Sequence, residues 1–129
     1  MRFLSGEWLA AVDQALSSSQ QVAGATADTS LRLLQVVTGA PEGTVAYVVA
    51  VDHGAVRVTT AAPHDGADVT LTSDWSTAVA VATGALAPHD AFTDGRLRVR
   101  GDIDVLRAQA PALAGLHAAF DEVRASTTY

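Results

Sequence analysis

The sequence predicts an α+β fold in which helices pack on one face of a sheet of five strands. Four short segments between residues 31 and 72 are rich in valine, leucine and threonine, and turns with glycine, proline or aspartate separate them, which is the pattern of consecutive strands. The flanking segments repeat apolar residues every three or four positions, as amphipathic helices do. One more alternating segment, residues 96–100, lies among these helices. A run of strands with helices grouped around it is typical of the α+β class.

The first predicted helix covers Ser5–Leu16. Its apolar stripe consists of Trp8, Leu9, Val12, Ala15 and Leu16. Ser5 is the expected N-cap, because its hydroxyl can accept a hydrogen bond from an amide of the first turn. The small, polar residues 17–30 that follow show no apolar periodicity, so we expect a mobile loop there.

Three strands are expected next. Leu31–Thr38 is followed, after a turn, by Thr44–Asp52 and Ala55–Thr60. The last two form a hairpin whose two-residue loop is His53-Gly54. This loop sets the register, which pairs Val51 with Val56 and Val49 with Val58. One face of the hairpin then carries Tyr47, Val49, Val51, Val56 and Val58, and the other carries Ala46, Val48, Ala50, Arg57 and Thr59.

The fourth strand is Asp68–Thr72, with its two apolar residues turned inward. Either Ser73 or Asp74 caps the helix that follows, and Gly84 ends it. The apolar face of this helix consists of Trp75, Ala78, Val79 and Ala82.

Residues 91–102, A-F-T-D-G-R-L-R-V-R-G-D, combine a helix end, a short strand and a new helix start. The incoming helix begins at Pro88 and carries Phe92 as a large apolar anchor. Gly95 can adopt positive φ without steric cost, as the residue after a helix often must. The fifth strand is Arg96–Arg100. Its two faces carry Leu97 and Val99 on one side and Arg96, Arg98 and Arg100 on the other.

The C-terminal part is predicted to be helical. Asp102 is the expected N-cap of a helix that Pro111 breaks. This helix aligns Ile103, Leu106 and Ala110, and the last helix buries Leu113, Leu116, Phe120 and Val123.

Composition and charge exclude several classes of function. The 129 residues form one expected domain, residues 1–129, and the hydrophobic content of 49% predicts a globular core. The net charge of −6 argues against a nucleic-acid partner, and no apolar run is long enough for stable insertion into a membrane. The N-terminal residues lack the apolar region of a secretory signal and the chain has no cysteine, so we expect a cytoplasmic location. The oligomeric state is left open.

The sequence contains no motif of known chemistry. The four histidines are His53, His64, His89 and His117, and no two of them have the spacing of metal ligands. Nucleophile-elbow, phosphate-loop and dinucleotide-binding patterns are absent from the sequence. We therefore predict no catalytic residue, no metal and no cofactor.

Two segments resemble the sterol carrier protein type 2 family. The first is A-D-V-T-L-T-S-D-W, residues 67–75, with Gly84 ten residues after its aspartate Asp74. The second is A-F-T-D-G-R-L-R-V-R-G-D, where the family usually shows A-F and then G-K-L-K-V-x-G-D. Arginine replaces the usual lysine at positions 96 and 98. The resemblance extends over roughly Leu31 to Leu116 and indicates a stand-alone, bacterial-type carrier domain.

The resemblance implies a mostly antiparallel five-stranded sheet and a hydrophobic tunnel between the sheet and the helices. It also implies non-covalent carriage of a lipid or another apolar small molecule, such as a fatty acid, an acyl-CoA ester or a sterol-like body. The candidate tunnel lining is Leu33, Tyr47, Val49, Val69, Leu71, Trp75, Val79, Phe92, Leu97, Leu106, Leu116 and Phe120. Each of these residues also fits an ordinary core position, because a core and a tunnel wall share the same pattern.

Polar contacts to a headgroup have few candidates. Arg96, Arg98 and Arg100 can form bidentate contacts with a phosphate or a carboxylate, and His117 flanks the apolar stripe of the last helix. The alternative is that the arginines form a solvated strand face that discourages pairing with other chains.

Two other classes of function stay open. A small cyclase or isomerase acting on an apolar intermediate would need an ionisable group in the pocket, for which Tyr47 and His117 are the candidates. A protein-interaction module would have a filled core and a flat apolar patch on the outer sheet face at Ala46, Val48 and Ala50.

Overall fold

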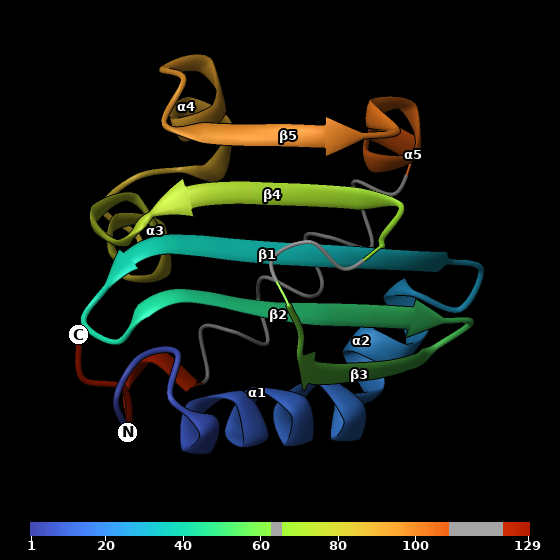
Figure 1. Cartoon of the computed structure of the whole chain (residues 1–129). Helices are drawn as coiled ribbons and strands as arrows, with labels where there is room; N and C mark the ends of the chain where they lie inside the picture. Colours follow the sequence, from blue (N-terminus) through green and yellow to red (C-terminus); the bar gives the residue numbers. More distant parts are fainter. Residues whose placement is uncertain (63–65, 109–122) are drawn as a thin grey trace.

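A computed structural model describes residues 1–62, 66–108 and 123–129 and contains a five-stranded mixed sheet (Figure 1). The strands are β1 (Ser30–Ala40), β2 (Gly43–Asp52), β3 (Ala55–Thr60), β4 (Val69–Asp74) and β5 (Leu97–Gly101). They lie in the order β3-β2-β1-β4-β5, and the three pairs other than β1–β4 are antiparallel. The predicted α+β class and mostly antiparallel sheet are confirmed. The parallel β1–β4 pair arises because the chain crosses from one edge of the sheet, past β2 and β1, before it forms β4.

The described helices are α1 (Gly6–Ser18), α2 (Gln20–Ala25), α3 (Trp75–Ala82), α4 (Pro88–Thr93) and α5 (Ile103–Ala108). The prediction of a loop over residues 17–30 was wrong, since α2 lies within it. The Ser19 side chain accepts a hydrogen bond from Val22 N, and Val22 is the single buried residue of α2. One apolar anchor in six residues produces no periodicity, so no pattern in the sequence predicted this helix.

Side-chain caps start three of the helices where the sequence predicted them. The Ser5 hydroxyl accepts a hydrogen bond from Trp8 N at 3.1 Å, and Asp102 Oδ1 accepts one from Val105 N at 3.2 Å. Of the two candidates before α3, Asp74 is the cap, and its carboxylate accepts a hydrogen bond from Thr77 N at 2.7 Å. The hydrogen bonds from the side chain and the backbone of Thr77 lower the pKa of the Asp74 carboxyl below its usual value.

The β2–β3 hairpin has the predicted register, with Val51 opposite Val56 and Val49 opposite Val58. Its loop residues have positive φ, 46° at His53 and 91° at Gly54. Two successive positive φ values define a turn whose twist matches that of the flanking strands.

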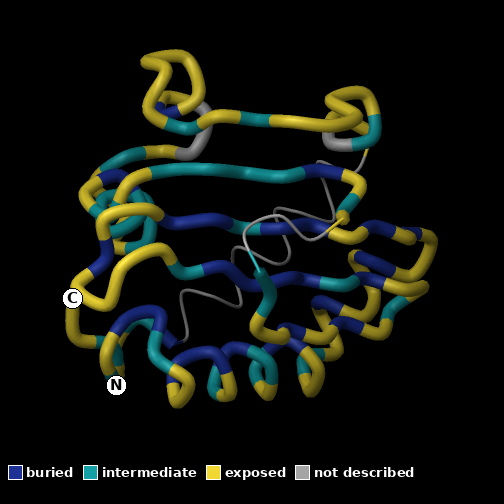
Figure 2. The backbone as a smooth tube through the Cα atoms, viewed as in Figure 1, coloured by how far each residue is buried: buried dark blue, intermediate teal, exposed yellow. Residues whose placement is uncertain are grey.

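The inner face of β1, β2 and β3 packs against α1 in the main core. Buried residues of α1 are Trp8, Leu9, Val12 and Leu16, and those of the strands are Leu31, Leu33, Val37, Tyr47, Val49, Val51, Val56 and Val58. In Figure 2, the dark blue segments that mark buried residues lie along α1 and along the neighbouring strands. Described residues of α2, α3 and α5 contribute to the same core, so these helices lie on one face, as predicted.

The outer face has a second, smaller cluster. Leu34, Val36, Ala46 and Val48 are buried there, with Ala50, Ala61 and Ala67 packed against them. Ala61 and Ala67 belong to the connection between β3 and β4, and Ala61 N donates a hydrogen bond to Ala46 O at 3.1 Å. Ala46 and Val48 are therefore buried, with Ala61 and Ala67 packed against their cluster, and they do not form the exposed apolar patch that an interaction module would require.

Candidate ligand-binding site

The inner face of the sheet continues over β4 and β5, where its apolar side chains are only half-buried. Register pairs Leu71 with Val99 and Ser73 with Leu97, so these side chains share the face that the helices cover. The half-buried apolar residues of this surface are Leu71, Trp75, Val79, Leu97, Val99 and Val105, which we call the β4–β5 surface. It combines two strands, the face of α3 and the start of α5, and it is the candidate site for an apolar ligand.

The start of α3 is held in place by polar contacts. Thr77 is fully buried, and its Oγ1 accepts a hydrogen bond from Arg96 Nε at 3.1 Å. Arg96 also lowers the pKa of Asp74 by its positive charge, although less than the hydrogen bonds from Thr77 do. Arg96, the residue directly before β5, therefore ties this strand to the first turn of α3. This contact positions Trp75 and Val79 beside the strands.

Arg98 and Arg100 lie on the other side of β5. They pair with Thr72 and Thr70 of β4, and both arginines are exposed. Within residues 1–62, 66–108 and 123–129, neither arginine forms an ion pair. Because strand side chains alternate between faces, these guanidinium groups point away from the β4–β5 surface, and a headgroup bound by them would lie outside the helix-covered face.

The structure divides the predicted tunnel residues into groups. Leu33, Tyr47, Val49 and Val69 are buried in the main core, whereas Leu71, Trp75, Val79 and Leu97 meet on the β4–β5 surface. Leu116, Phe120 and His117 lie outside the described residues, as does the side chain of Leu106.

Phe92 departs from its predicted place as a buried anchor. It is 48% exposed, while its neighbour Ala91 is fully buried. Successive helical residues differ by about 100° in direction, so the face of α4 that presents Ala91 to the protein turns Phe92 toward solvent. The small residue, rather than the large one, is the anchor because α4 lies close to β5.

Tyr47, a candidate ionisable group for an enzyme, lies in packed surroundings. Its ring makes an edge contact with Trp8, with the ring centroids 5.9 Å apart. Burial raises the pKa of the Tyr47 hydroxyl far above its usual value, which keeps the hydroxyl protonated at neutral pH. Tyr47 is thus a core residue of the α1 side and does not face the small pocket described next.

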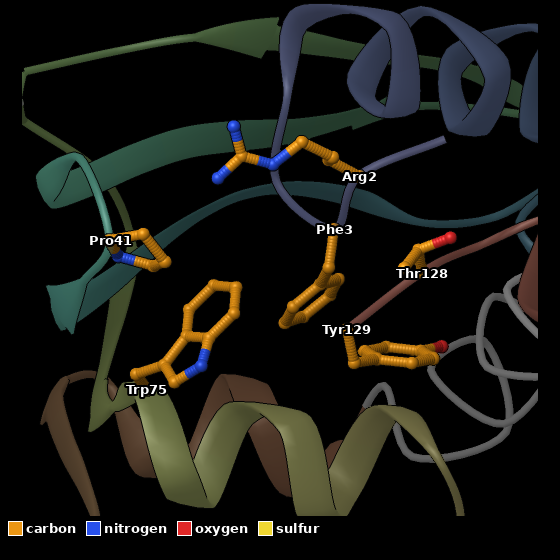
Figure 3. Close-up of a pocket in the computed structure, with 6 residues that line it drawn as sticks. All are labelled: Arg2, Phe3, Pro41, Trp75, Thr128 and Tyr129. Carbon is orange, nitrogen blue, oxygen red and sulfur yellow. The ribbon is translucent and has the colours of Figure 1, made fainter.

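A pocket of about 100 Å³ lies where the two ends of the described chain meet (Figure 3). Its walls are Arg2, Phe3, Pro41, Trp75, Thr128 and Tyr129. An apolar cavity of about 150 Å³ holds a molecule of the size of benzene, so this smaller pocket cannot enclose a lipid. It borders the β4–β5 surface through their common residue Trp75.

Sequence reasoning gave no role to Phe3 or Tyr129, which form an aromatic cluster beside this pocket. The Phe3 ring lies 5.0 Å from Trp8, 5.4 Å from Trp75 and 5.1 Å from Tyr129, between ring centroids. Backbone contacts hold the segment ends together, with Phe3 N donating to Thr128 O at 2.9 Å. The chain has only seven aromatic residues, so the presence of aromatic rings near both ends was the one available signal.

The described residues lack two further kinds of feature. Among residues 1–62, 66–108 and 123–129, no group of three or more metal-ligating side chains is found. No helix in this part of the chain is both long and apolar enough to cross a bilayer.

Comparison with solved structures gives the same fold. A conserved hypothetical protein from Thermus thermophilus is 27% identical and superposes with a TM-score of 0.80 over 94% of this chain and 89% of that chain. A sterol carrier protein 2 is 25% identical, with a TM-score of 0.78 over 93% and 98% of the two chains. The apo form of sterol carrier protein 2 from Yarrowia lipolytica shares the fold at 17% identity, with a TM-score of 0.65 over 88% of each chain.

Sequence comparison confirms the family that the two segments resemble. No curated protein sequence matches this chain significantly. The model of the SCP-2 sterol transfer family matches residues 11–114, a range that contains all five strands. The chain therefore belongs to the SCP-2 sterol transfer family.

Proposed function

We propose that this chain acts as a single, non-catalytic domain that binds and transfers a lipid or a similar apolar molecule, of the class of fatty acids, acyl-CoA esters or sterol-like bodies. The β4–β5 surface is the binding surface. The observation that supports this assignment is the half-burial of its apolar side chains, in a fold whose other inner strands are fully packed. Membership of a sterol transfer family supports the same class of ligand.

Desolvation supplies the affinity. Leu71, Val79 and Val99 present apolar surface that is not fully covered by protein, and a bound chain would remove that area and its own from water. At about 25 cal/mol per Å², burial of roughly 300 Å² of apolar area contributes on the order of 7 kcal/mol before the entropic costs of binding are subtracted. Such an interaction is non-directional, so it tolerates variation in the ligand.

The first test is native mass spectrometry of the purified protein, followed by extraction under denaturing conditions. A retained lipid of defined mass supports the proposal. If the protein is free of ligand, titration with a fluorescent fatty acid and with a fluorescent sterol replaces this test. Failure of both probes to bind would contradict the proposal.

A pair of variants tests the location. Leu71→Gln introduces a polar side chain on the β4–β5 surface, whereas Thr72→Gln places the same side chain one residue later on the opposite face. We expect Leu71→Gln to weaken lipid binding about tenfold and Thr72→Gln to leave it unchanged. Equal effects would place the ligand elsewhere.

A further inference from the structure

The two edges of the sheet differ in how their backbone groups are covered. At the β3 edge, α1 packs along the strand, and Asp13 Oδ1 accepts hydrogen bonds from Val58 N at 2.7 Å and from Arg57 Nε at 3.1 Å. The β5 edge is the top edge in Figure 1, with α4 and α5 at its two ends. Within the part of the chain that the structure describes, no strand pairs with this outer side of β5.

Register shows which backbone groups of β5 face outward. Asp102 N donates to Asp68 O, and alternate residues of an antiparallel strand bond to the same neighbour, so Arg100 and Arg98 turn their amide and carbonyl groups toward β4. Leu97 and Val99 therefore turn theirs away from the sheet. No hydrogen bond to these outward groups occurs among the described residues.

The side chains around this edge provide charge and apolar surface. Arg98 and Arg100 project from the outer face without ion pairs among the described residues, two residues apart. Three large hydrophobic residues are exposed in the described chain, and two of them flank β5: Phe92 of α4 at 48% and Ile103 of α5 at 42%. The edge thus offers backbone donors and acceptors, two cations on one face and an apolar contact at each end.

We propose that the β5 edge binds an extended acidic segment of a partner protein, which adds a sixth strand to the sheet. The outward groups of Leu97 and Val99 would supply the backbone hydrogen bonds, as in other cases of strand addition. Acidic side chains at alternate positions of the partner would pair with Arg98 and Arg100, and the intervening apolar residues would extend the inner face. The strand β5 is five residues long, about 17 Å, which sets the length of the recognised segment.

A second copy of this chain is a poor occupant of the same edge. Pairing of β5 with β5 would bring Arg98 and Arg100 of two copies together on one face, and like charges on neighbouring strands are destabilising. The chain as a whole carries a net charge of −6, so it does not attract acidic segments in general. The attraction comes from Arg98 and Arg100 and acts only close to this edge. Strand addition at this edge does not depend on lipid binding at the β4–β5 surface.

The test uses the full chain and two blocked five-residue peptides, Glu-Val-Glu-Val-Glu and Lys-Val-Lys-Val-Lys. Binding is followed by changes in the amide signals of the protein in NMR spectra. We expect the acidic peptide to bind at least about tenfold more tightly than the basic one, with the largest changes at residues 96–101. Equal binding, or changes confined to other strands, would overturn the proposal.

Two variants separate the backbone and charge contributions. Val99→Pro removes an outward amide, and proline is tolerated on an edge strand when its nitrogen faces away from the sheet. Val99→Pro should weaken binding of the acidic peptide about tenfold. Should this variant fail to fold, an acidic peptide N-methylated at its three central residues, which blocks the bonding amides in either strand orientation, should show at least the same loss on the unaltered protein. Arg98→Glu together with Arg100→Glu should reverse the preference between the two peptides.

Anionic vesicles provide the remaining comparison. Vesicles of phosphatidylglycerol that bind through Arg98 and Arg100, with no binding of the acidic peptide, would assign this edge to a lipid surface and overturn the proposal. Absence of binding by either probe would identify the arginines as protection against strand pairing and would equally overturn it.

Discussion

Where β1, β2 and β3 meet α1, the inner-face side chains are buried, whereas where β4 and β5 meet α3 and α5, most are half-buried (Figure 2). The first region combines two long strands, β1 of 11 residues and β2 of 10, and the shorter β3 with an amphipathic helix whose buried residues face them. The second combines strands of five and six residues with two short helices, α3 of eight residues and α5 of six. The first region is therefore closely packed, whereas the second leaves apolar side chains partly exposed, as the proposed binding of a ligand there requires.

The sharpest test of this difference compares two leucines. Leu16→Ala opens a cavity in the fully packed region and should cost roughly 3 kcal/mol of unfolding free energy. Leu71→Ala removes a half-buried side chain from the β4–β5 surface and should cost about 1 kcal/mol. Urea denaturation of both variants measures the two values. Equal losses would show that the two regions are packed alike and would break the comparison.

Gly101, the last residue of β5, and Gly95, two residues before the strand begins, provide the next test. A Cβ at Gly101 would lie 2.3 Å from Asp68 O, and the residue has a φ of +103°, so the backbones of β4 and β5 could not keep their spacing. Gly95 has a φ of +75° with nothing near its Cβ position. Gly101→Ala should cost roughly 3 kcal/mol and Gly95→Ala about 1 kcal/mol, as measured by thermal unfolding. A larger loss at Gly95 would contradict the close approach of β4 to β5.

Sequence patterns predicted the strands and helix caps well because their causes are local. The loop residues His53 and Gly54 fix the hairpin register, and Asp74 fixes the start of α3. The helix α2 was missed because a single buried valine, Val22, holds it. Phe92 was misplaced because the closeness of α4 to β5, which favours Ala91 at the contact, depends on tertiary structure.

The candidate site could likewise be predicted only where its residues depend on local sequence. Leu71 and Val49 both occupy inward-facing positions of a predicted strand, so the alternation of side chains made them equally good candidates for the tunnel lining. They differ because α1 covers β2, while β4 lies beyond the reach of that helix. Which strand a helix covers is set by the order β3-β2-β1-β4-β5, and strand order is not encoded in the alternation of one strand.

Removal of the cap of α3 tests the link between stability and the β4–β5 surface. Asp74→Ala deletes the carboxylate that accepts the hydrogen bond from Thr77 N and should cost about 1 kcal/mol at neutral pH. The pKa of Asp74 is lowered in the folded protein, so its contribution is full above the unfolded pKa and is lost as the pH falls through the folded value. The stability difference between the variant and the unaltered protein should therefore shrink in acid, as followed by urea denaturation at several pH values. A difference that is constant down to acidic pH would assign the loss to packing instead.

The smallest expected effect concerns the covered β3 edge. Asp13→Ala removes hydrogen bonds to Val58 N and to Arg57 Nε and should cost roughly 0.5–1 kcal/mol, whereas Arg57→Ala removes only the exposed ion pair and should cost less than about 0.5 kcal/mol. Chemical denaturation at low and high salt measures both. The backbone hydrogen bond contributes more than the ion pair because it holds α1 against the strand, so the Asp13→Ala loss should persist at high salt. If high salt abolished the stability loss of Asp13→Ala, the ion pair with Arg57 would be the main contact that holds α1 to β3. The two edges of the sheet would then differ in charge rather than in how their backbone groups are covered.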